Sequence, residues 1–459
     1  MKRIILLCDG TWNEDDNRRP VSSIVRLRAL LARSLDEDSS IVTRGRAGAA
    51  VEQGVDVGAH RVKRVSGRTH RGIEHIVYYD RGVGTGPWLD PIKGGAFGLG
   101  LGHNVRQAYR FLSFHYEPDD EIYVFGFSRG AFTARSLVGY VAAAGLLRRE
   151  ACTPARENEA WQFYRTPPND RLSGIWSELT SFVHDRDRLR VTLLGVFDTV
   201  GALGIPIQLA RRLNRSRYEF HDVTLGSISD VNLQALAVDE RRKPFQAAVW
   251  RKPQFKFYAT EVEQVWFAGV HSDVGGGYVD HFSSHSDDDG ALDDISFDWM
   301  VKRITHFTDL PLDLTQCKKI DASWAACAQH DSFIRYYRLF RPVVRSIANT
   351  EHAATSKECT GYDRLADAIG EMIHRSVLER LGRQNVGPHT ARGYSPPNVV
   401  AVLGMIEATY GVRRENGPPR KLLVVNWDGH VMSAEDDATR AEVMSLLGAA
   451  RDRLPQAKP

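Results

Sequence analysis

Short runs of apolar residues recur along the chain of 459 residues, and each run ends in a turn rich in glycine, aspartate or other polar residues. Continuous apolar runs of this length are typical of strands buried on both faces, the arrangement found in mostly parallel sheets. The five clearest runs are Ile4–Cys8, Ile76–Tyr79, Ile122–Phe125, Val191–Phe197 and Val265–Val270. The pattern therefore predicts a buried, mostly parallel sheet.

Helical patterns lie between these runs. Apolar residues from His103 to Phe114 recur at the spacing of one helical face, and Ala131–Ala144 reads as a second helix that leaves a strand directly. Strands that alternate with helices predict an α/β fold, with helices on both faces of the sheet. The polar stretches Ala151–Leu189 and Arg211–His221 predict cap or insertion segments outside the sheet.

Two further stretches bear on domain organisation. Residues 44–71 hold seven Lys and Arg against two acids, which predicts a basic, solvated insertion; an anionic partner such as lipid headgroups is the alternative. After Tyr410 a linker rich in Gly, Pro and Arg precedes one strand-like run, Leu422–Trp427, and a helix-like tail. We therefore expect a catalytic domain of residues 1–400 and a short C-terminal extension of residues 401–459.

The composition is that of an ordinary globular protein, with 42% hydrophobic and 25% charged residues. Sixty Lys and Arg against 57 Asp and Glu give a formal net charge of +3, so the chain lacks the strong basic bias of most nucleic-acid binders. Its five cysteines are scattered and form no CxxC pair, which disfavours a disulfide scaffold or a zinc ribbon and favours a reducing compartment.

Nothing in the sequence predicts a signal peptide or a membrane-spanning helix. The first apolar run has five residues before Asp9, whereas the apolar region of a signal peptide has roughly 7–15. No stretch approaches the roughly 18 apolar residues that a spanning helix requires. We therefore expect a protein that is cytoplasmic as synthesised, with membrane contact at most peripheral.

The most informative motif is Gly126-Phe127-Ser128-Arg129-Gly130, which has the form G-x-S-x-G. A predicted strand enters it and a predicted helix leaves it, which is the setting of the nucleophile elbow of α/β-hydrolases. There the serine hydroxyl stands above the sheet, at the positive end of the following helix. A nucleotide-binding turn is the alternative, but neither G-x-G-x-x-G nor a Walker lysine follows this strand. The motif therefore predicts Ser128 as a nucleophile.

A serine nucleophile needs a base and an acid that orients it. His271 follows the last predicted strand and opens a glycine-rich turn, at the sheet edge where parallel-sheet enzymes place their chemistry. Asp198 follows the preceding predicted strand, and the order Ser128, Asp198, His271 is that of α/β-hydrolases. Asp273 is the rival acid; its alternative role is to brace the turn through local backbone hydrogen bonds.

The oxyanion of the reaction needs backbone donors. We expect one from the Arg129 amide and another from Gly10 or Thr11 in the loop after the first strand, with Asp9 bracing that loop. The acidic run Asp287–Asp289 fails the EF-hand pattern and predicts a solvated loop. The serine mechanism requires no metal, and we predict neither a metal nor a cofactor.

Six ordered motifs together resemble the DUF2235 α/β-hydrolase domain family, whose members include type VI secretion lipase effectors with a phospholipase catalytic domain. The resemblance extends from about residue 1 to about residue 400. The motifs are CDGTWN (Cys8–Asn13), YYDRGVGTG (Tyr78–Gly86), GFSRGAFTAR (Gly126–Arg135), FDTVG (Phe197–Gly201), DERRKPF (Asp239–Phe245) and WFAGVHSDVGGGY (Trp266–Tyr278).

This resemblance implies a Ser-Asp-His hydrolase of carboxylic esters, with phospholipids as the best-known substrates and Ser128, Asp198 and His271 as the triad. It implies a lipid or small ester substrate, and a secretion apparatus and an immunity protein as candidate partners, with export by a type VI secretion system. Relative to the family the basic stretch 44–71 is inserted, and we expect the large membrane-anchoring region of some effectors to be lacking. The alternatives are a cytoplasmic esterase or thioesterase acting on a non-lipid substrate, and a catalytically silent binding module.

Overall fold

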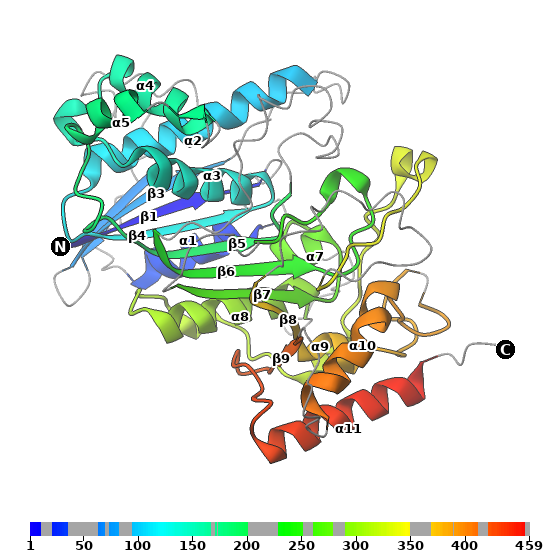
Figure 1. Cartoon of the computed structure of the whole chain (residues 1–459). Coiled ribbons are helices and arrows are strands. Elements are labelled where there is room, and N and C mark those ends of the chain that lie inside the picture. The colour runs from blue at the N-terminus through cyan, green and yellow to red at the C-terminus, as the bar shows by residue number, and fades with distance from the viewer. Residues whose placement is uncertain are drawn as a thin grey trace. The chain divides into compact units, whose positions relative to one another are not determined.

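Mostly parallel β-sheet with helices on both faces organises the chain, as the apolar runs predicted (Figure 1). The computed structural model describes residues 1–10, 21–34, 63–68, 73–81, 94–166, 170–171, 173–200, 228–250, 260–278, 290–348, 369–388, 390–411 and 421–454. The strands are β1 Lys2–Cys8, β2 Lys63–Arg68, β3 Glu74–Asp80, β4 Glu121–Phe127, β5 Val191–Phe197, β6 Ser229–Ala237, β7 Glu261–Phe267, β8 Glu371–His374 and β9 Leu423–Val425. The α-helices are α1 Ser23–Ser34, α2 Gly94–His115, α3 Arg129–Ala144, α4 Pro154–Arg165, α5 Ser173–Thr180, α7 His271–Gly275, α8 Leu292–Phe307, α9 Arg375–Arg380, α10 Pro397–Tyr410 and α11 Asp437–Arg453.

Two compact units divide the chain. The first comprises Met1–Leu233, Pro253–Glu261 and Leu310–Gln316, and the second comprises Gln234–Lys252, Val262–Asp309 and Cys317–Pro459. Strand β6 begins in the first unit and ends in the second. The division into residues 1–400 and 401–459 stays a prediction; in the structure, β9 and α11 belong to the same unit as β8.

In the first unit the strands follow the order β2-β3-β1-β4-β5-β6. Strand β1 pairs in parallel with β3 on one side and β4 on the other, and β4 pairs in parallel with β5. Helices α2 and α3 lie on one face of these strands, and α1 lies on the other (Figure 1). Because both faces are covered, nearly every residue of β1, β4 and β5 is buried, which explains their continuous apolar sequences.

Strand β2 overturns part of the expectation of a solvated loop over residues 44–71. Lys63–Arg68 runs antiparallel to β3, with Lys63 opposite Tyr79 and Arg68 opposite Glu74. It is the outermost strand of its unit, and basic residues on an edge strand discourage pairing with another chain. The remainder of the stretch lies outside the described residues.

The polar segment after Ala151 lies outside the sheet, as predicted, and its helix α4 packs against α3. Glu157 of α4 is fully buried and accepts hydrogen bonds from Arg106 and Arg110 of α2, at 2.6 and 2.7 Å. The Tyr140 hydroxyl of α3 donates to the backbone oxygen of Glu157 at 3.0 Å. These bonds fix α4 against both helices, because a buried carboxylate left without its cations would be costly.

In the second unit the order is β6-β7-β8-β9, with β7 parallel to β8 and β8 parallel to β9. Successive residues of a strand point to opposite faces of the sheet. The contacts of Trp266 and Phe267 in β7 therefore show what covers each face. Trp266 packs into a core with residues of α9, α10 and α11. Phe267 contacts Trp299 of α8, with ring centroids 5.5 Å apart. Helices therefore cover both faces of these strands.

Candidate active site

Ser128 occupies a sharp turn between the end of β4 and the start of α3. Its backbone has φ 58° and ψ −118°, a region that residues with a side chain rarely adopt and that costs on the order of 1–3 kcal/mol. The turn is held because the Ser128 amide donates a hydrogen bond to the carbonyl oxygen of Phe197 in β5, at 3.0 Å. This strained strand-turn-helix geometry is that of a nucleophile elbow.

Two glycines make the turn possible. A Cβ atom on Gly126 would lie 2.5 Å from the carbonyl oxygen of Gly130, and a Cβ atom on Gly130 would lie 2.1 Å from the carbonyl oxygen of Cys8. Both distances are far shorter than van der Waals contact, so a side chain at either position would force backbone apart. Gly126 therefore lets the end of β4 approach the start of α3, and Gly130 lets α3 approach the end of β1.

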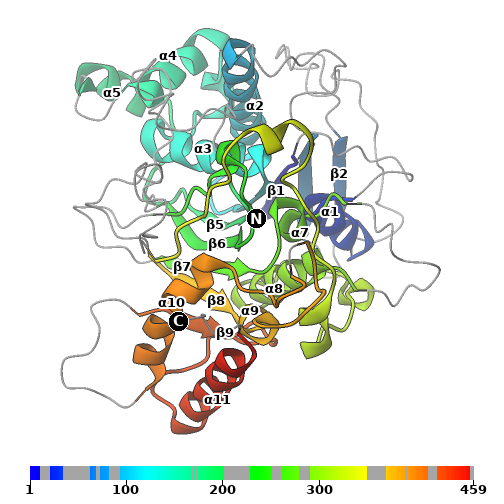
Figure 2. The same ribbon diagram turned by 90° about the vertical axis from the view of Figure 1, so that its right-hand side faces the viewer.

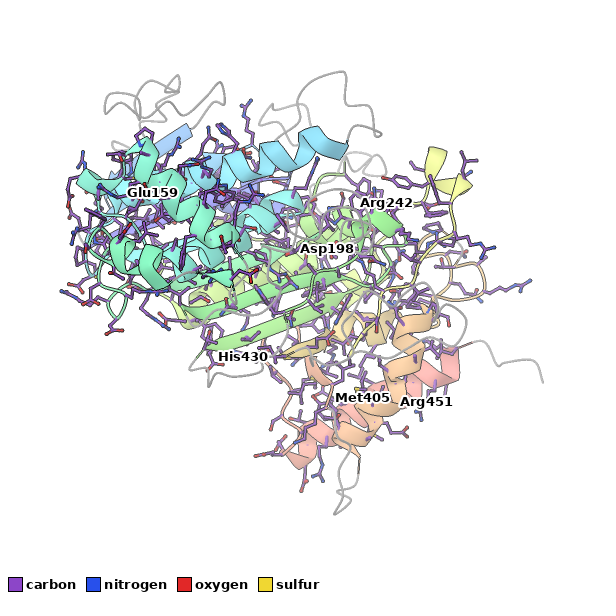
Figure 3. The ribbon with its side chains drawn as sticks, turned by 45° about the horizontal axis from the view of Figure 1, so that its top comes forward. Glu159, Asp198, Arg242, Met405, His430 and Arg451 are labelled. Carbon is purple, nitrogen blue, oxygen red and sulfur yellow. The ribbon has the colours of Figure 1, made fainter. Side chains whose placement is uncertain are left out.

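Asp198 lies at the carboxyl end of β5, next to the Ser128 turn. Phe127 and Phe197, which precede Ser128 and Asp198, are register partners in the parallel pair of β4 and β5. Asp198, labelled in Figure 3, is fully buried and has a φ of 38°, so it too is held in an uncommon conformation. The structure thus brings the predicted nucleophile and acid to the ends of neighbouring strands.

Asp9 follows β1 and is fully buried. Its carboxylate accepts hydrogen bonds from the Tyr79 hydroxyl at 2.8 Å and the Ser22 hydroxyl at 2.9 Å. The same carboxylate accepts a hydrogen bond from the Gly10 amide at 2.7 Å. Asp9 therefore ties the loop after β1 to β3 and to the residue before α1.

The three backbone amides predicted to bind the oxyanion differ in whether the structure leaves them able to do so. The hydrogen of the Gly10 amide is already used by the Asp9 carboxylate, so the geometry does not support Gly10 as a donor. Thr11 lies outside the described residues. Arg129 is the first residue of α3, and amides of a first helical turn point toward whatever lies at the helix N-terminus. The Arg129 amide thus remains the better placed candidate.

Arg129, the residue after Ser128, has a largely buried side chain. Burial lowers the pKa of its guanidinium to about 10, because removal from water disfavours the charged form. At neutral pH the group is still protonated. The residue that follows Ser128 in the chain therefore carries a positive charge, and it is also the first residue of α3, where the helix dipole is positive.

His271 lies after β7 and is the first residue of α7. Strand β7 is Glu261–Phe267, so it ends three residues earlier than the apolar run predicted, and a turn leads to the histidine. His271 is only 4% exposed. Its ring contacts that of Phe245 edge-on, with centroids 5.0 Å apart. The imidazole is thus buried against an aromatic ring rather than exposed on a loop.

Asp273, the rival acid, makes its contacts within the turn and with a distant loop. Its carboxylate accepts hydrogen bonds from the amides of Val270 at 3.0 Å and His330 at 3.2 Å. It also lies 2.6 Å from Nδ1 of His330, whose ring stacks on Tyr278 at 3.9 Å between centroids. These contacts fit the bracing role for Asp273. They also reveal a His–Asp pair that sequence reasoning missed, because His330 lies in no recognisable motif.

Glu240 is a second buried carboxylate beside His271 that was not singled out from the sequence. It accepts hydrogen bonds from the His271 amide at 3.3 Å, from the Arg242 guanidinium at 2.8 Å and from the Ser332 hydroxyl at 3.1 Å. Burial alone would raise the pKa of Glu240, but the hydrogen bond and charge of Arg242 outweigh burial and lower it. The interaction with His271 also lowers the pKa of Glu240. The DERRKPF motif held the only signal for it.

Asp239, next in sequence, behaves differently. It is buried and accepts hydrogen bonds from the Gly269 amide and the Tyr394 hydroxyl, both at 2.7 Å. Burial raises the pKa of Asp239 to about 6, since these two bonds only partly compensate for lost hydration. The strand ends of the second unit therefore hold a carboxyl group that titrates near physiological pH.

The predicted site residues thus fall in two groups. Asp9, Arg129 and Asp198 lie in the same unit as Ser128, and Asp273 lies in the same unit as His271. Among the described residues, no group of three or more His, Cys, Asp or Glu side chains is arranged to hold a metal ion. The acidic run Asp287–Asp289 lies outside those residues.

Three known proteins are similar to parts of this chain. The uncharacterized protein YEL023C of Saccharomyces cerevisiae is 30% identical over 194 residues, which are 38% of this chain and 27% of the yeast protein. The crystal structure of an uncharacterized protein from Pseudomonas aeruginosa covers 68% of this chain and 46% of that chain, with 17% identity and a TM-score of 0.38. The Tle1 effector bound to the VgrG spike of the Type 6 secretion system covers 60% of this chain and 51% of that chain, with 20% identity and a TM-score of 0.29. The chain therefore spans about half or less of each of these proteins.

The family comparison covers more of the sequence. Residues 2–303 match the family described as T6SS, Phospholipase effector Tle1-like, catalytic domain. This range is well over half of the chain and contains Ser128, Asp198 and His271. The chain therefore belongs to the family of Tle1-like phospholipase effectors of type VI secretion systems, which it matches through their catalytic domain.

Proposed function

We propose that the protein is a serine hydrolase that cleaves carboxylic ester bonds of phospholipids through Ser128, His271 and Asp198. Membership of a phospholipase effector family supports the ester substrate. The observation that carries the proposal is the strained turn at Ser128, bonded to β5 at the residue before Asp198. Strain of this kind is retained where function requires it, because the surrounding packing must offset its cost.

The reaction proceeds in two halves. The Ser128 hydroxyl oxygen attacks the ester carbonyl carbon while His271 takes the hydroxyl proton, and Asp198 orients and stabilises the imidazolium. The resulting oxyanion accepts hydrogen bonds from backbone amides at the start of α3, that of Arg129 among them. The ester C–O bond then breaks, His271 protonates the departing alcohol, and the acyl group stays on Ser128.

Water completes the cycle. His271 takes a proton from a water molecule, whose oxygen attacks the acyl carbon, and collapse of the second oxyanion releases the fatty acid and returns the proton to Ser128. A phospholipid carries an anionic phosphate near the ester. The protonated Arg129 side chain provides a cation one residue from the nucleophile for that charge.

The first test is fatty-acid release from mixed phospholipid vesicles by wild type and Ser128→Ala. We expect the variant to lose about 10⁴-fold or more in turnover, because a hydroxyl nucleophile has no substitute. Ser136→Ala on the same helix is the matched control and should retain wild-type release. Equal release by wild type and Ser128→Ala would remove Ser128 from the mechanism.

The acid is assigned by comparing Asp198→Asn with Asp273→Asn. We expect Asp198→Asn to lower kcat by about 10⁴-fold and Asp273→Asn to lower it by less than about tenfold, because only the former removes the acid that orients the base. Stability is measured for both, since each carboxylate is buried. A comparable loss of kcat in a stable Asp273→Asn protein would transfer the role to Asp273.

Labelling by a fluorophosphonate probe separates the alternatives. Labelling at Ser128 without lipid hydrolysis would indicate an esterase or thioesterase with a non-lipid substrate. No labelling and no turnover, with ligand binding unchanged in Ser128→Ala, would indicate a silent binding module. The first result would contradict the lipid substrate, and the second would contradict catalysis itself.

Membership of the family, rather than the geometry of the site, supports a proposal about export. We propose export by a type VI secretion system, with the secretion apparatus and an immunity protein as partners. Within the part of the chain that the structure describes, no helix is both long and apolar enough to cross a bilayer.

A further inference from the structure

A loop of the second unit carries exposed apolar side chains at its tip. The short 3₁₀ helix η8, Arg335–Leu339, lies at the end of an extended loop that projects beyond α7, drawn in yellow (Figures 1 and 2). Leu339 is 85% exposed, Phe340 61% and Ile334 41%. Of the eight large hydrophobic side chains that are exposed in the described residues, three therefore fall within seven consecutive positions.

The base of this loop, in contrast, is firmly packed. The Arg345 side chain is buried and donates hydrogen bonds to the carbonyl oxygens of Ala237 and Phe245. The Val343 amide donates to the carbonyl oxygen of Arg241 at 2.9 Å. An anchored base with an apolar tip indicates that the loop holds these side chains out in water instead of folding them onto the core.

The tip is basic as well as apolar. From Ser332 to Arg345 the sequence has four arginines and no aspartate or glutamate. Arg338 and Arg341 are exposed beside Leu339 and Phe340. Apolar side chains interleaved with arginines suit the boundary between lipid headgroups and acyl chains, where the apolar groups enter and the cations meet phosphates.

Packed rings connect the tip with the proposed catalytic base. The Tyr337 ring of η8 lies 6.5 Å from that of Phe245, which in turn lies 5.0 Å from that of His271, each pair edge-on. The guanidinium carbon of Arg242, a residue labelled in Figure 3, lies 3.6 Å from the centroid of the Phe245 ring. Tyr337 of η8 is therefore connected with His271 through the ring of Phe245, so a membrane that binds the tip would lie near the proposed catalytic base.

We propose that Ile334, Arg338, Leu339, Phe340 and Arg341 form a docking tip that inserts into an anionic phospholipid surface and presents it to the active site. The inference rests on the proposed function, since a phospholipase must reach lipid packed in a bilayer. The absence of acidic residues along the tip favours a uniformly anionic surface over a protein face of mixed charge.

The test measures binding separately from hydrolysis. The full-length Ser128→Ala protein is floated with vesicles of phosphatidylcholine alone and with vesicles that also contain phosphatidylglycerol. In this background Leu339→Ser with Phe340→Ser should weaken partitioning on the order of tenfold or more. Arg338→Gln with Arg341→Gln should weaken it by about fivefold for each arginine, on the anionic vesicles only, and added salt should mimic this loss.

Val400→Ser on α10 is the matched control, because Val400 is 40% exposed and lies outside the tip. Its partitioning should equal that of Ser128→Ala. Thermal midpoints are compared first, so that a misfolded variant is not mistaken for a weak binder. The proposal is overturned if Ser128→Ala does not bind anionic vesicles, which would leave a protein as the occupant, or if the tip variants bind as Val400→Ser does.

Wild-type hydrolysis of detergent-dispersed phospholipid distinguishes the two proposals, because no bilayer has to be reached there. Hydrolysis without tip-dependent vesicle binding overturns the docking tip alone. Tip-dependent binding without hydrolysis supports the docking tip and contradicts the phospholipase assignment.

Discussion

Gly130 lies so close to the backbone of β1 that adding a single methyl group should destabilise the fold. We expect Gly130→Ala to lower the free energy of unfolding by about 3 kcal/mol, because the new Cβ would lie 2.1 Å from the carbonyl oxygen of Cys8 and overpacking typically costs 1–3 kcal/mol. Denaturant titration measures the change. Gly448→Ala in α11 is the control: its Cβ would meet nothing within 4 Å, and alanine should stabilise that helix by roughly 0.5–1 kcal/mol.

Equal effects of these two substitutions would mean that the tight approach of α3 to β1 does not exist in solution. The comparison is informative because both changes add one methyl group to a helical glycine. Only the surroundings differ.

Single residues could be predicted from the sequence where the neighbouring residues in the chain identify them. Ser128 sits within a pentapeptide whose glycines satisfy contacts that the structure shows, and Asp198 directly follows a buried strand. Glu240 and His330 could not be found in this way. The contact of His330 with Asp273 joins positions 57 residues apart, and nothing in the spacing of polar and apolar residues encodes a pairing of that range.

Among the elements, helix α9 depends on a histidine at its N-terminus. The side chain of His374 accepts a hydrogen bond from the Ser376 amide, at 3.2 Å. Burial, followed by the charge of Lys302, lowers the pKa of His374 to about 3. The folded value is below the unfolded value of about 6.5, so the stabilisation is complete above pH 6.5 and is lost as the pH falls toward 3.

We therefore expect His374→Asn, whose side-chain oxygen keeps the cap, to flatten the loss of stability between pH 6.5 and 4. The slope is read from denaturant midpoints at several pH values, at about 1.4 kcal/mol for each unit of pKa difference. Wild type measured in parallel gives the reference slope. An unaltered slope in His374→Asn would show that other groups govern acid unfolding.

Strands were predictable from the sequence where a continuous run of apolar residues is buried. Strands that contain buried polar residues, or that are very short, were missed. Strand β5 matches its apolar run residue for residue. Strand β6 was not predicted because Asn232 and Gln234 interrupt it, yet both are buried; the amide of Gln234 donates to Gln264 at 3.1 Å and that of Asn232 to Thr260 at 2.8 Å. Strand β8 has only four residues, too few to show a period.

For the whole molecule, the dependence of stability on pH reflects two buried groups with opposite effects. The folded pKa of Asp239, about 6, lies above the unfolded value of about 3.9. Its contribution is therefore complete below pH 3.9 and is lost as the pH rises through 6, whereas that of His374 changes in the other direction over much of the same range.

We expect Asp239→Asn, which can still accept from Gly269 and Tyr394, to make the protein more acid-sensitive relative to its stability at pH 7. Removing the opposing group should steepen the fall below pH 6.5 by on the order of 2–3 kcal/mol in total. Unfolding curves between pH 4 and 8 measure it. A curve parallel to that of wild type would mean that Asp239 is ionised in the fold throughout this range.

The division into units was the least predictable property of the molecule. The compact units divide within β6 and take in segments distant in sequence, such as Leu310–Gln316 in the first unit. The composition of the chain marks neither of these divisions, and the predicted boundary near residue 400 stays a prediction. The two units divide within strand β6, whose residues are not those of a linker. The boundary therefore has no local mark in the sequence.

The placement of β8 and β9 has a consequence for anyone who dissects this protein. The family match ends at residue 303, before either strand. A chain cut there would leave the edge of β7 without β8, and Trp266 without the helices that cover it. Unpaired strand edges and bare apolar surface lead to aggregation and to capture by chaperones and proteases. The smallest piece that can be produced as a working catalyst should therefore be larger than the catalytic domain by which its family is recognised.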